Sequence, residues 1–366
     1  MSRALEATAP GKLVLLGEYT VLFGAPALVM AIDRRARVVL EPSSDTRWHA
    51  ESPGLVPGRA AFEVGPDGGV RWEDPGAAEG LALVTGLFRD LSRTGLLDPA
   101  GLPPQILILD TRAFFGGDIP GRPKLGLGSS AALTVALAAG LLDLAGDGNV
   151  PGPGTILGPL VEAHRGLQGG RGSGIDVAAS LLGGVLRYEL DSRGSQPHAV
   201  PVSLPPELRL RFVWTGRAAS TGGFLSRLER SLVLRETGTV ACLDELGKLS
   251  ARGLDELAGD RLPDFLDTVR SFTGTLERLG ALMGSPILSP EHRRLRELAS
   301  EAGVAYKPSG AGGGDFGIVF GTEEDRLGRF TRAASLEGFR PTTLREDPVG
   351  AVCSADSPVP SKPTDV

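Results

Sequence analysis

A long apolar run between Ala131 and Leu144 carries a single charged residue, Asp143. A helix that is apolar on every side is normally buried, so this run predicts a mostly buried helix. The segment 126–130, directly before the run, reads GLGSS. These small residues lie where the unpaired N–H groups of the helix N-terminus point outward.

The rest of the pattern mixes strands with helices. Short apolar or alternating segments predict strands at 13–19, 36–42, 104–111, 184–190, 208–216, 316–321 and 350–355. Apolar residues at helical spacing predict helices at 79–95 and 156–170 and a helical region at 226–303. Turn residues predict a loop with Gly24 and Pro26, a hairpin region at 43–78, a loop at 146–154 and a turn at 191–197. The predicted fold class is α+β.

The length of 366 residues fits two domains. We place the boundary near residue 190, so that the N-terminal domain spans 1–190 and the C-terminal domain spans 191–354. The segment 355–366 has little apolar surface to bury, and we expect it to be a disordered tail.

Composition argues against several classes of protein. The formal net charge of −6 does not favour nonspecific nucleic-acid binding. The two cysteines and four histidines are scattered and lack metal-ligand spacing. No charge-free stretch approaches the length of a membrane span, and the N-terminus lacks the apolar core of a signal peptide. We therefore expect a cytoplasmic protein that binds neither nucleic acid nor membranes.

The segment 126–130 combines glycines with a helix N-terminus. Glycine adopts backbone angles that let a loop curve tightly around a ligand. A helix start offers free N–H donors and partial positive charge, and phosphate is the anion that such sites usually bind. The segment matches neither the G-x-x-x-x-G-K-[ST] loop nor a G-x-G-x-x-G loop after a strand. Glycine–serine loops also simply cap helices, so both interpretations stay open at this point.

Three further segments carry candidate chemistry. Four glycines crowd 310–314, flanked by Lys307 and Asp315, and close approach of a ligand or another backbone explains them better than a simple turn. Lys12 precedes the first predicted strand, where taken alone a solvated lysine at the strand edge is the favoured interpretation. Asp176 follows a glycine-rich turn and begins a helix of small residues, where an aspartate is commonly an N-cap.

All four segments occur in the order found in one family, the GHMP kinases. PGKLVLLGEYTVLFGAPAL at 10–28 resembles the first family motif. PKLGLGSSAAL at 123–133 resembles the second motif, the ATP-phosphate loop, and KPSGAGGGDFGIVF at 307–320 resembles the third. The resemblance covers nearly the whole chain.

Within the family, the chain is most similar to the phosphomevalonate kinase branch. It reads GEY at 17–19, where mevalonate kinases typically have GEH. AHRGLQGGRGSGIDVAAS at 163–180, VWTGRAAST at 213–221 and KPSGAGGGD at 307–315 also resemble segments of that branch.

The resemblance implies a two-domain GHMP kinase fold. Its N-terminal α/β domain would have a left-handed-type crossover, its C-terminal domain would be ferredoxin-like, and ATP would bind in the cleft between them. The implied cofactors are ATP and Mg²⁺, and the implied reaction transfers the γ-phosphoryl group to phosphomevalonate. Phosphoryl transfer depends mainly on positioning and charge neutralisation. By resemblance, Asp176 orients or deprotonates the attacking oxygen and Lys12 stabilises negative charge.

The resemblance also assigns binding residues. The implied nucleotide-binding residues are Lys124, Gly126, Leu127, Gly128, Ser129, Ser130 and Ala131, of which Ser130 would also reach Mg²⁺. The implied substrate-binding residues are Glu18, Tyr19, Arg171, Ser173, Gly174, Arg217, Ser220, Thr221, Lys307, Ser309, Gly310, Ala311, Gly312 and Gly313. A phosphorylated acceptor brings about two negative charges into the cleft, for which Lys124, Arg171, Arg217 and Lys307 are the candidate cations.

One correspondence with the family differs. Mevalonate kinases have a metal-binding glutamate eleven residues before the aspartate, and this chain has Arg165 there, with Glu162 nearby as a substitute metal candidate. The alternative functions are mevalonate kinase, a sugar or homoserine kinase, an ATP-dependent decarboxylase, and a non-catalytic binding protein of the same fold. A mere binding protein has no need for both Lys12 and Asp176, which argues against the last. We expect a monomer or a homodimer.

Overall fold

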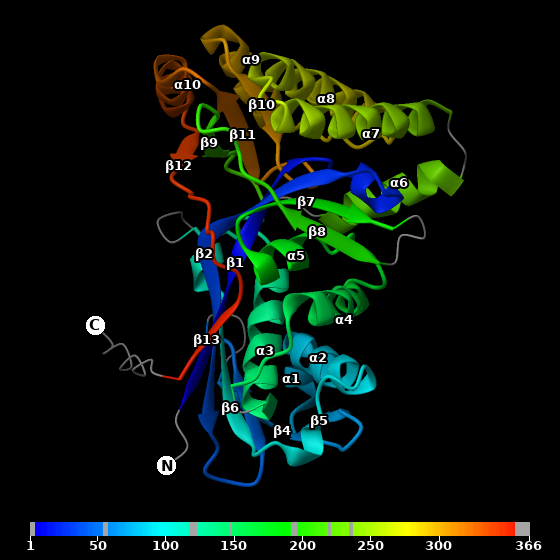
Figure 1. The fold of residues 1–366 in the computed structure, drawn as a ribbon, viewed down its shortest axis with the longest axis vertical. Coiled ribbons are helices and arrows are strands. Elements are labelled where there is room, and N and C mark those ends of the chain that lie inside the picture. Colours follow the sequence, from blue (N-terminus) through cyan, green and yellow to red (C-terminus); the bar gives the residue numbers. More distant parts are fainter. Residues whose placement is uncertain are drawn as a thin grey trace.

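The computed structural model describes residues 4–53, 58–116, 123–146, 148–191, 196–218, 221–233 and 237–355. Two β-sheets form the frame of the protein, and helices pack against both of them (Figure 1). The larger sheet belongs to the lower part of the molecule in Figure 1, and the smaller sheet lies near its top.

Within the described residues, the larger sheet has nine strands in the order β13-β1-β2-β6-β3-β4-β5, with β7 paired to β2 and β8 to β7. The bounds are β1 (Leu5–Leu16), β2 (Ala27–Pro42), β3 (Trp48–Glu51), β4 (Arg59–Val64), β5 (Val70–Trp72), β6 (Gln105–Asp110), β7 (Val185–Leu190), β8 (Pro197–Pro201) and β13 (Val352–Ser354). β3 and β6 are parallel, whereas β1 and β2 are antiparallel. β2 is long enough for β7 to pair with its first residues and β6 with its last.

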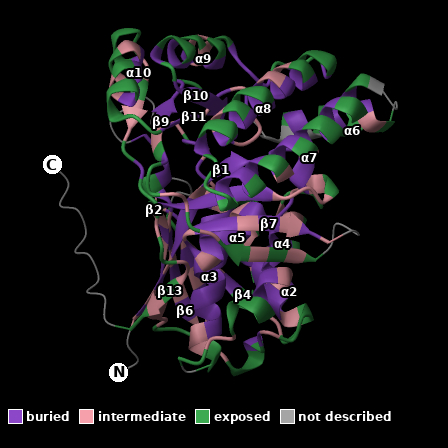
Figure 2. Ribbon diagram, turned by 45° about the horizontal axis from the view of Figure 1, so that its top comes forward, coloured by how far each residue is buried: buried purple, intermediate pink, exposed green. Residues whose placement is uncertain are grey.

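The central helix of this domain is α3 (Ser129–Gly146), which packs against β1 and β2. Among the described residues, it is the one helix long and apolar enough to cross a membrane, and 72% of it is buried inside the protein. Its apolar composition therefore belongs to the core, where buried residues surround it (Figure 2). The other helical elements here are α1 (Pro75–Gly80), α2 (Ala82–Arg93), α4 (Pro153–Leu167), α5 (Ile175–Leu182) and the 3₁₀ turns η1 (Thr20–Phe23), η2 (Pro99–Gly101) and η3 (Arg112–Phe114).

The smaller sheet has the strand order β10-β11-β9-β12, with every pair antiparallel. Its strands are β9 (Arg209–Trp214), β10 (Ala305–Pro308), β11 (Phe316–Gly321) and β12 (Arg340–Thr342). The helices are α6 (Thr221–Val233), α7 (Thr237–Ala258), α8 (Leu262–Leu282), α9 (Pro290–Ala302) and α10 (Glu324–Leu336). Helices separate β9 from β10 and β11 from β12, which is the β-α-β-β-α-β arrangement of a ferredoxin-like domain.

The structure corrects several predictions made from periodicity. The predicted loop at 27–35 is the first half of β2, and the predicted turn at 191–197 leads into β8. The helix α10 was not predicted, although Leu327, Phe330 and Ala334 bury one of its faces. The predicted helical region at 226–303 is four helices, of which the first already begins at Thr221.

Two strands cross the predicted domain boundary. β8 pairs with β7, and β13 pairs with β1, so both lie in the larger sheet although the prediction assigned 191–354 to the second domain. We propose that the division falls between β8 and β9 and that the end of the chain returns to the first domain. Of the tail predicted to be disordered, 356–366 lie outside the described residues.

Candidate active site

A cavity of about 540 Å³ brings together all four segments singled out in the sequence. Its lining comes from 12–22, 124–131, 168–176, residue 218 and 310–315. The predicted site residues that line it are Lys12, Glu18, Tyr19, Lys124, Gly126, Gly128, Ser129, Ser130, Ala131, Arg171, Ser173, Asp176, Gly310 and Ala311. Residues from both ends of the chain therefore share one site.

The loop before α3 has the geometry expected of a phosphate loop. Gly126 and Gly128 have φ angles of +72° and +84°, which side chains disfavour. The backbone N–H of Lys12 donates to the carbonyl oxygen of Leu127 at 2.8 Å, which ties β1 to the loop. A Cβ at Gly11 would lie 2.6 Å from that same oxygen. The close approach of strand and loop thus requires glycine at position 11.

Lys12 and Asp176 line the cavity from different elements. The side chain of Lys12 lies along Gly128, so that a Cβ there would be 3.1 Å from Lys12 Cγ. Asp176 lies in the first turn of α5, and its Oδ1 accepts a hydrogen bond from the Val177 N–H at 3.0 Å. The N-cap of α5 is Gly174, so Asp176 is not the cap that the alternative interpretation required. No ion pair within 4.0 Å joins these two described residues.

His164, which the sequence did not single out, is not part of the cavity lining but lies next to two residues that are. It lies near the end of α4 and is only 2% exposed. Its Nε2 lies 3.3 Å from Ser130 Oγ, and its Nδ1 lies 3.9 Å from Asp176 Oδ1. The sequence signal was a histidine in the last turn of α4, followed by the glycine-rich loop before Asp176, which did not show where its ring would point.

The loop that leads into Asp176 is held by two side chains. Arg165 donates hydrogen bonds to the carbonyl oxygens of Gly172 at 2.8 Å and Ser173 at 3.3 Å. The hydroxyl of Tyr188 also donates to Ser173 O, and burial raises the Tyr188 pKa above its usual value. Gly174 has φ +81°, and a Cβ there would be 2.5 Å from Val161. Arg165 therefore shapes the loop that leads into Asp176.

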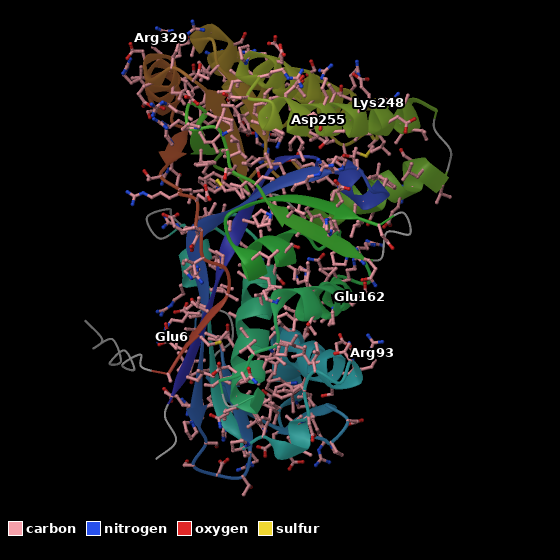
Figure 3. The ribbon with its side chains drawn as sticks, viewed as in Figure 1. Glu6, Arg93, Glu162, Lys248, Asp255 and Arg329 are labelled. Carbon is pink, nitrogen blue, oxygen red and sulfur yellow. The ribbon has the colours of Figure 1, made fainter. Side chains whose placement is uncertain are left out.

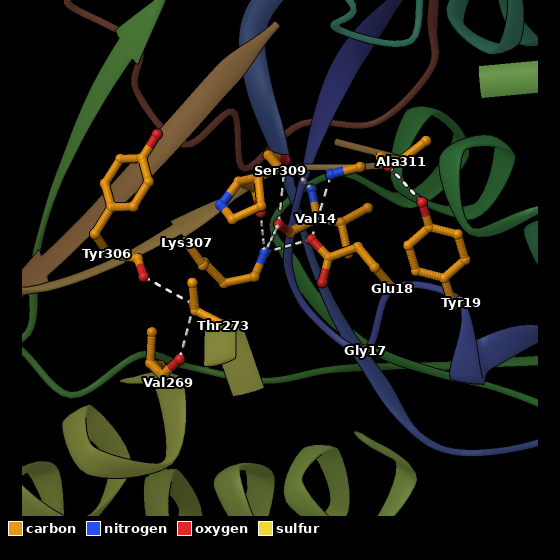
Figure 4. A network of polar contacts seen from close by, with 12 residues as sticks. Val14, Gly17, Glu18, Tyr19, Val269, Thr273, Tyr306, Lys307, Ser309 and Ala311 are labelled. Carbon is orange, nitrogen blue, oxygen red and sulfur yellow. Dashed lines mark hydrogen bonds and ion pairs between the residues drawn. The ribbon is translucent and has the colours of Figure 1, made fainter. Parts of the chain in front are cut away.

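Glu18 and Lys307 form a buried ion pair between the two domains (Figure 4). Lys307 is 0% exposed, and it also donates to Val14 O at 3.2 Å and Pro308 O at 2.7 Å. Burial raises the pKa of the Glu18 carboxyl and lowers that of the Lys307 ammonium, and their mutual attraction opposes both shifts. Lys307 is not part of the cavity lining and its charge is paired with Glu18, which does line the cavity, so the role of Lys307 as a cation for the acceptor stays a prediction that this pair argues against.

The third motif divides into residues that face the cavity and residues that pack. Gly310 and Ala311 line the cavity, and the Tyr19 hydroxyl donates to Ala311 O. Ser309 instead bonds to the backbone of Val14, accepting from its N–H at 3.1 Å and donating to its carbonyl at 3.2 Å. Gly312 and Gly313 pack against other parts of the protein. A Cβ at Gly312 would lie 2.5 Å from Ile287 O, and a Cβ at Gly313 would lie 2.7 Å from the ring of Phe224.

Asp315, a flanking charge of the third motif, also lines the cavity. It has φ +59°, and its carboxylate fills the space beside the phosphate loop, 2.1 Å from where a Cβ at Gly126 would be. Its backbone N–H donates to Arg217 O at 2.7 Å, and its carbonyl accepts from Thr215 N at 2.9 Å. The segment 215–217 and the third motif therefore reach the phosphate loop as one unit.

The remaining predicted cations differ in position. Arg171 lines the cavity, and its guanidinium donates to Ser226 Oγ at 2.9 Å and lies 3.4 Å from Glu229. The side chain of Arg217 is 63% exposed and lies 3.7 Å from Glu291, outside the cavity lining. Ser220 lies outside the described residues, and Thr221 begins α6.

The donor groups in the cavity suit Mg²⁺, which the family resemblance implies. The Ser130 hydroxyl and the Asp176 carboxylate line the same cavity and are hard oxygen ligands. The described residues contain no group of three or more His, Cys, Asp or Glu that could hold a metal ion by themselves. This fits Mg²⁺, which usually takes one or two protein ligands together with phosphates and water.

Glu162, the substitute metal candidate, lies elsewhere. It projects from α4 at the protein surface (Figure 3) and lines a neighbouring cavity of about 600 Å³. Its carboxylate lies 2.8 Å from the guanidinium of Arg165, and its side chain is 55% exposed. Glu162 is thus separated from Ser130 and Asp176 and does not complete a metal site with them.

The buried His292 holds the end of the glycine cluster in the third motif. Its Nε2 donates to Gly314 O at 2.8 Å, so its Nδ1 accepts from the Tyr306 hydroxyl at 2.6 Å. Burial lowers the pKa of His292 from 6.5 to about 4. The folded protein therefore keeps this ring neutral at pH values where the unfolded chain already protonates it.

We expect this histidine to make stability depend on pH. Between pH 6.5 and 4 the unfolded state binds more protons, so stability falls as pH falls through that window. Wild type should lose up to about 3 kcal/mol of unfolding free energy from pH 7 to pH 4 beyond what His292→Gln loses. Urea unfolding of both proteins at several pH values measures this difference. Parallel pH profiles would contradict it.

Comparison with known proteins identifies the family. The model of the GHMP kinases N terminal domain matches residues 104–184, and the GHMP kinases C terminal model matches 262–338. A phosphomevalonate kinase from Streptomyces sp. is 30% identical over 352 residues, covering 87% of this chain and 90% of that protein. A mevalonate kinase from Aeropyrum pernix is 30% identical over 294 residues, covering 78% and 76%.

A solved structure agrees with this fold. The Streptococcus pneumoniae phosphomevalonate kinase in complex with phosphomevalonate and AMPPNP has a TM-score of 0.73 at 19% identity, covering 93% of this chain and 99% of that chain. This similarity shows that the two chains share the same overall fold. The chain thus belongs to the GHMP kinase family of phosphotransferases.

Proposed function

We propose that this kinase transfers the γ-phosphoryl group of ATP to phosphomevalonate, giving diphosphomevalonate in the mevalonate pathway. The observation that carries the proposal is the single cavity in which the phosphate loop, Lys12, Asp176 and Arg171 meet. The Streptomyces phosphomevalonate kinase, similar over 87% of the chain, supports this choice of acceptor.

Different residues of the cavity have different roles in phosphoryl transfer. The loop before α3 offers backbone N–H groups and the positive end of the helix to the ATP phosphates. Lys12 places its ammonium in the same cavity, where it stabilises negative charge that develops on the transferred group. Mg²⁺, when bound to Ser130 and Asp176, supplies further neutralisation of the phosphates.

Asp176 has an orienting role toward the acceptor. A phosphate acceptor is largely ionised near neutral pH, so little proton removal is needed before it attacks. The carboxylate of Asp176 then matters mainly because it positions the attacking oxygen and the metal against the γ-phosphoryl group. Reaction with an unphosphorylated alcohol would depend much more strongly on a base at this position.

The charge of the cavity favours an acceptor that is already phosphorylated. Three cations, Lys12, Lys124 and Arg171, line it together with the carboxylates of Asp176 and Asp315, and the carboxylate of Glu18 is neutralised by Lys307. Arg171 lies on the loop that leads into Asp176, where it can meet a phosphate beyond those of ATP. Mevalonate kinase is the second candidate, because the Aeropyrum enzyme is also 30% identical, over less of the chain.

Acceptor preference tests this proposal. We expect a kcat/KM for phosphomevalonate at least about a hundredfold above that for mevalonate, which is roughly 2.7 kcal/mol of transition-state preference. Arg171→Gln should raise the KM for phosphomevalonate more than the KM for ATP. Arg187→Gln is a matched control, because Arg187 pairs with Glu189 at 2.6 Å outside the cavity and should leave both constants unchanged. Equal or faster turnover of mevalonate would instead support the mevalonate kinase assignment.

A further inference from the structure

His164 lies behind the cavity lining, next to two residues of that lining, Ser130 and Asp176. Its ring is almost completely buried, at 2% exposure, and it lies between the phosphate-loop serine and the aspartate on α5. Ser130 Oγ is 3.3 Å from Nε2, and Asp176 Oδ1 is 3.9 Å from Nδ1. These two residues come from different helices, and the imidazole is a single rigid group that touches both.

Gln168 determines which ring nitrogen carries the proton. Its amide nitrogen lies 3.4 Å from His164 Nε2, and an amide N–H can only donate. Nε2 is therefore the acceptor, and its single lone pair is shared between the Gln168 amide at 3.4 Å and the Ser130 hydroxyl at 3.3 Å. The hydrogen then resides on Nδ1, which faces the carboxylate of Asp176. The contacts with Gln168, Ser130 and Asp176 are thus all consistent with the tautomer that carries its hydrogen on Nδ1.

We propose that His164 is the positioning residue that orients both Asp176 and Ser130 for phosphoryl transfer. The Nδ1–H attracts Asp176 Oδ1 and fixes the direction of the carboxylate. The distance of 3.9 Å is long for a hydrogen bond, but such contacts often shorten when the substrates bind. The Nε2 accepts the Ser130 proton, so that the lone pairs of the serine oxygen are left for a cation in the cavity.

This inference rests on phosphoryl transfer at the proposed site but not on the identity of the acceptor. In metal sites, the partners that orient the ligands typically matter by about 10- to 100-fold in affinity or activity. We assign this orienting role to His164. The next residue, Arg165, already donates its hydrogen bonds to the carbonyl oxygens of Gly172 and Ser173.

Two substitutions separate the two contacts of the ring. His164→Gln can place an amide near the Nε2 position and keep the contact with Ser130, while it loses the contact with Asp176. His164→Asn can place an amide near the Nδ1 position and keep the contact with Asp176, while it loses the contact with Ser130. We expect His164→Gln to lower kcat about 10- to 100-fold, while it weakens binding of Mg²⁺·AMPPNP less than loss of the Ser130 contact does. His164→Asn should instead weaken Mg²⁺·AMPPNP binding in calorimetry, with less effect on nucleotide binding in EDTA.

A double-mutant cycle tests whether His164 acts through Asp176. In an Asp176→Asn background, His164→Gln should lower kcat little further, because the group that it orients has already been altered. Nitrogen-15 NMR of the imidazole should also show the Nδ1–H tautomer in wild type, and Gln168→Glu should change that signal. Independent, additive losses in the cycle, or equal losses of stability and activity in both His164 variants, would overturn the proposal.

These measurements distinguish this inference from the proposed function. The tautomer signal and the binding of Mg²⁺·AMPPNP do not involve an acceptor. If mevalonate proved to be the better acceptor, the choice of substrate would be wrong, while the cycle, run with that acceptor, would still test His164. A normal acceptor preference with an additive cycle would contradict only the role of His164.

Discussion

Asp176→Asn is expected to lower kcat at least about a hundredfold while ATP continues to bind, which is the usual scale for a positioned acid–base group. The substitution keeps the size of the side chain and removes its charge. The carboxylate lines the cavity beside the phosphate loop, so its loss removes orientation of the acceptor and of the metal. The phosphate loop itself is untouched, and nucleotide binding measured without metal should therefore remain.

A second aspartate provides a matched control for this experiment. Asp264 also lies in the first turn of a helix, α8. It is exposed, and it is far in the sequence from the segments that line the cavity. If Asp176 only stabilised the start of α5, both asparagine variants would lose a few tenths of a kcal/mol of stability and keep their activity. A steady-state assay with each acceptor, together with calorimetric ATP binding, separates these outcomes. Near-normal turnover of Asp176→Asn would reduce Asp176 to a structural residue.

The parts of the site that lie on continuous segments could be predicted only once their resemblance to the family motifs was added, because the residues alone favoured a solvated lysine at Lys12 and an N-cap at Asp176. Lys12, the loop at 126–131 and Asp176 each stand beside glycines or small residues at the end of a regular element. Their arrangement around one cavity follows from the family fold, and the structure places them there.

The roles that depend on a partner far along the chain could not be predicted. Lys307 looked like a cation for the acceptor because nothing in its own segment shows that Glu18, 289 positions earlier, faces it. The role of His164 could not be predicted either, because its two contacts, Ser130 and Asp176, come from separate helices. Residue type alone does not distinguish a buried charge from a ligand-binding one.

The fold shows the same limit. Residues 27–32 of β2 are buried on both faces, so they do not alternate, and the nearby Gly24 and Pro26 made them look like part of a loop. β8 is short and mostly exposed, and its pairing with β7 decides its structure. α10 did carry a helical pattern in Leu327, Phe330 and Ala334, which the sequence analysis missed beside its many charged residues.

Lys307→Met is expected to cause the largest loss of stability, about 3–5 kcal/mol, because it leaves a buried carboxylate without its partner. Glu18 is 4% exposed, and its Oε2 already has no hydrogen-bond partner in the protein. The Gly310 N–H, which donates to Glu18 Oε1 at 3.3 Å, cannot replace the ammonium. In the Lys307→Met variant we therefore also expect weaker contacts between β1, in the first domain, and the third motif, in the second.

The double variant Glu18→Gln/Lys307→Met removes both charges and provides the decisive comparison. It should recover much of the loss, since replacing a whole buried pair by neutral groups is often close to neutral in stability. Arg270→Met is the surface control: its pair with Asp267 at 2.6 Å is exposed, and such pairs contribute about 0–1 kcal/mol. Urea unfolding of the four proteins measures these free energies. If Lys307→Met behaved like Arg270→Met, the pair would not hold the two domains together, and Lys307 would again be available as a cation for the acceptor.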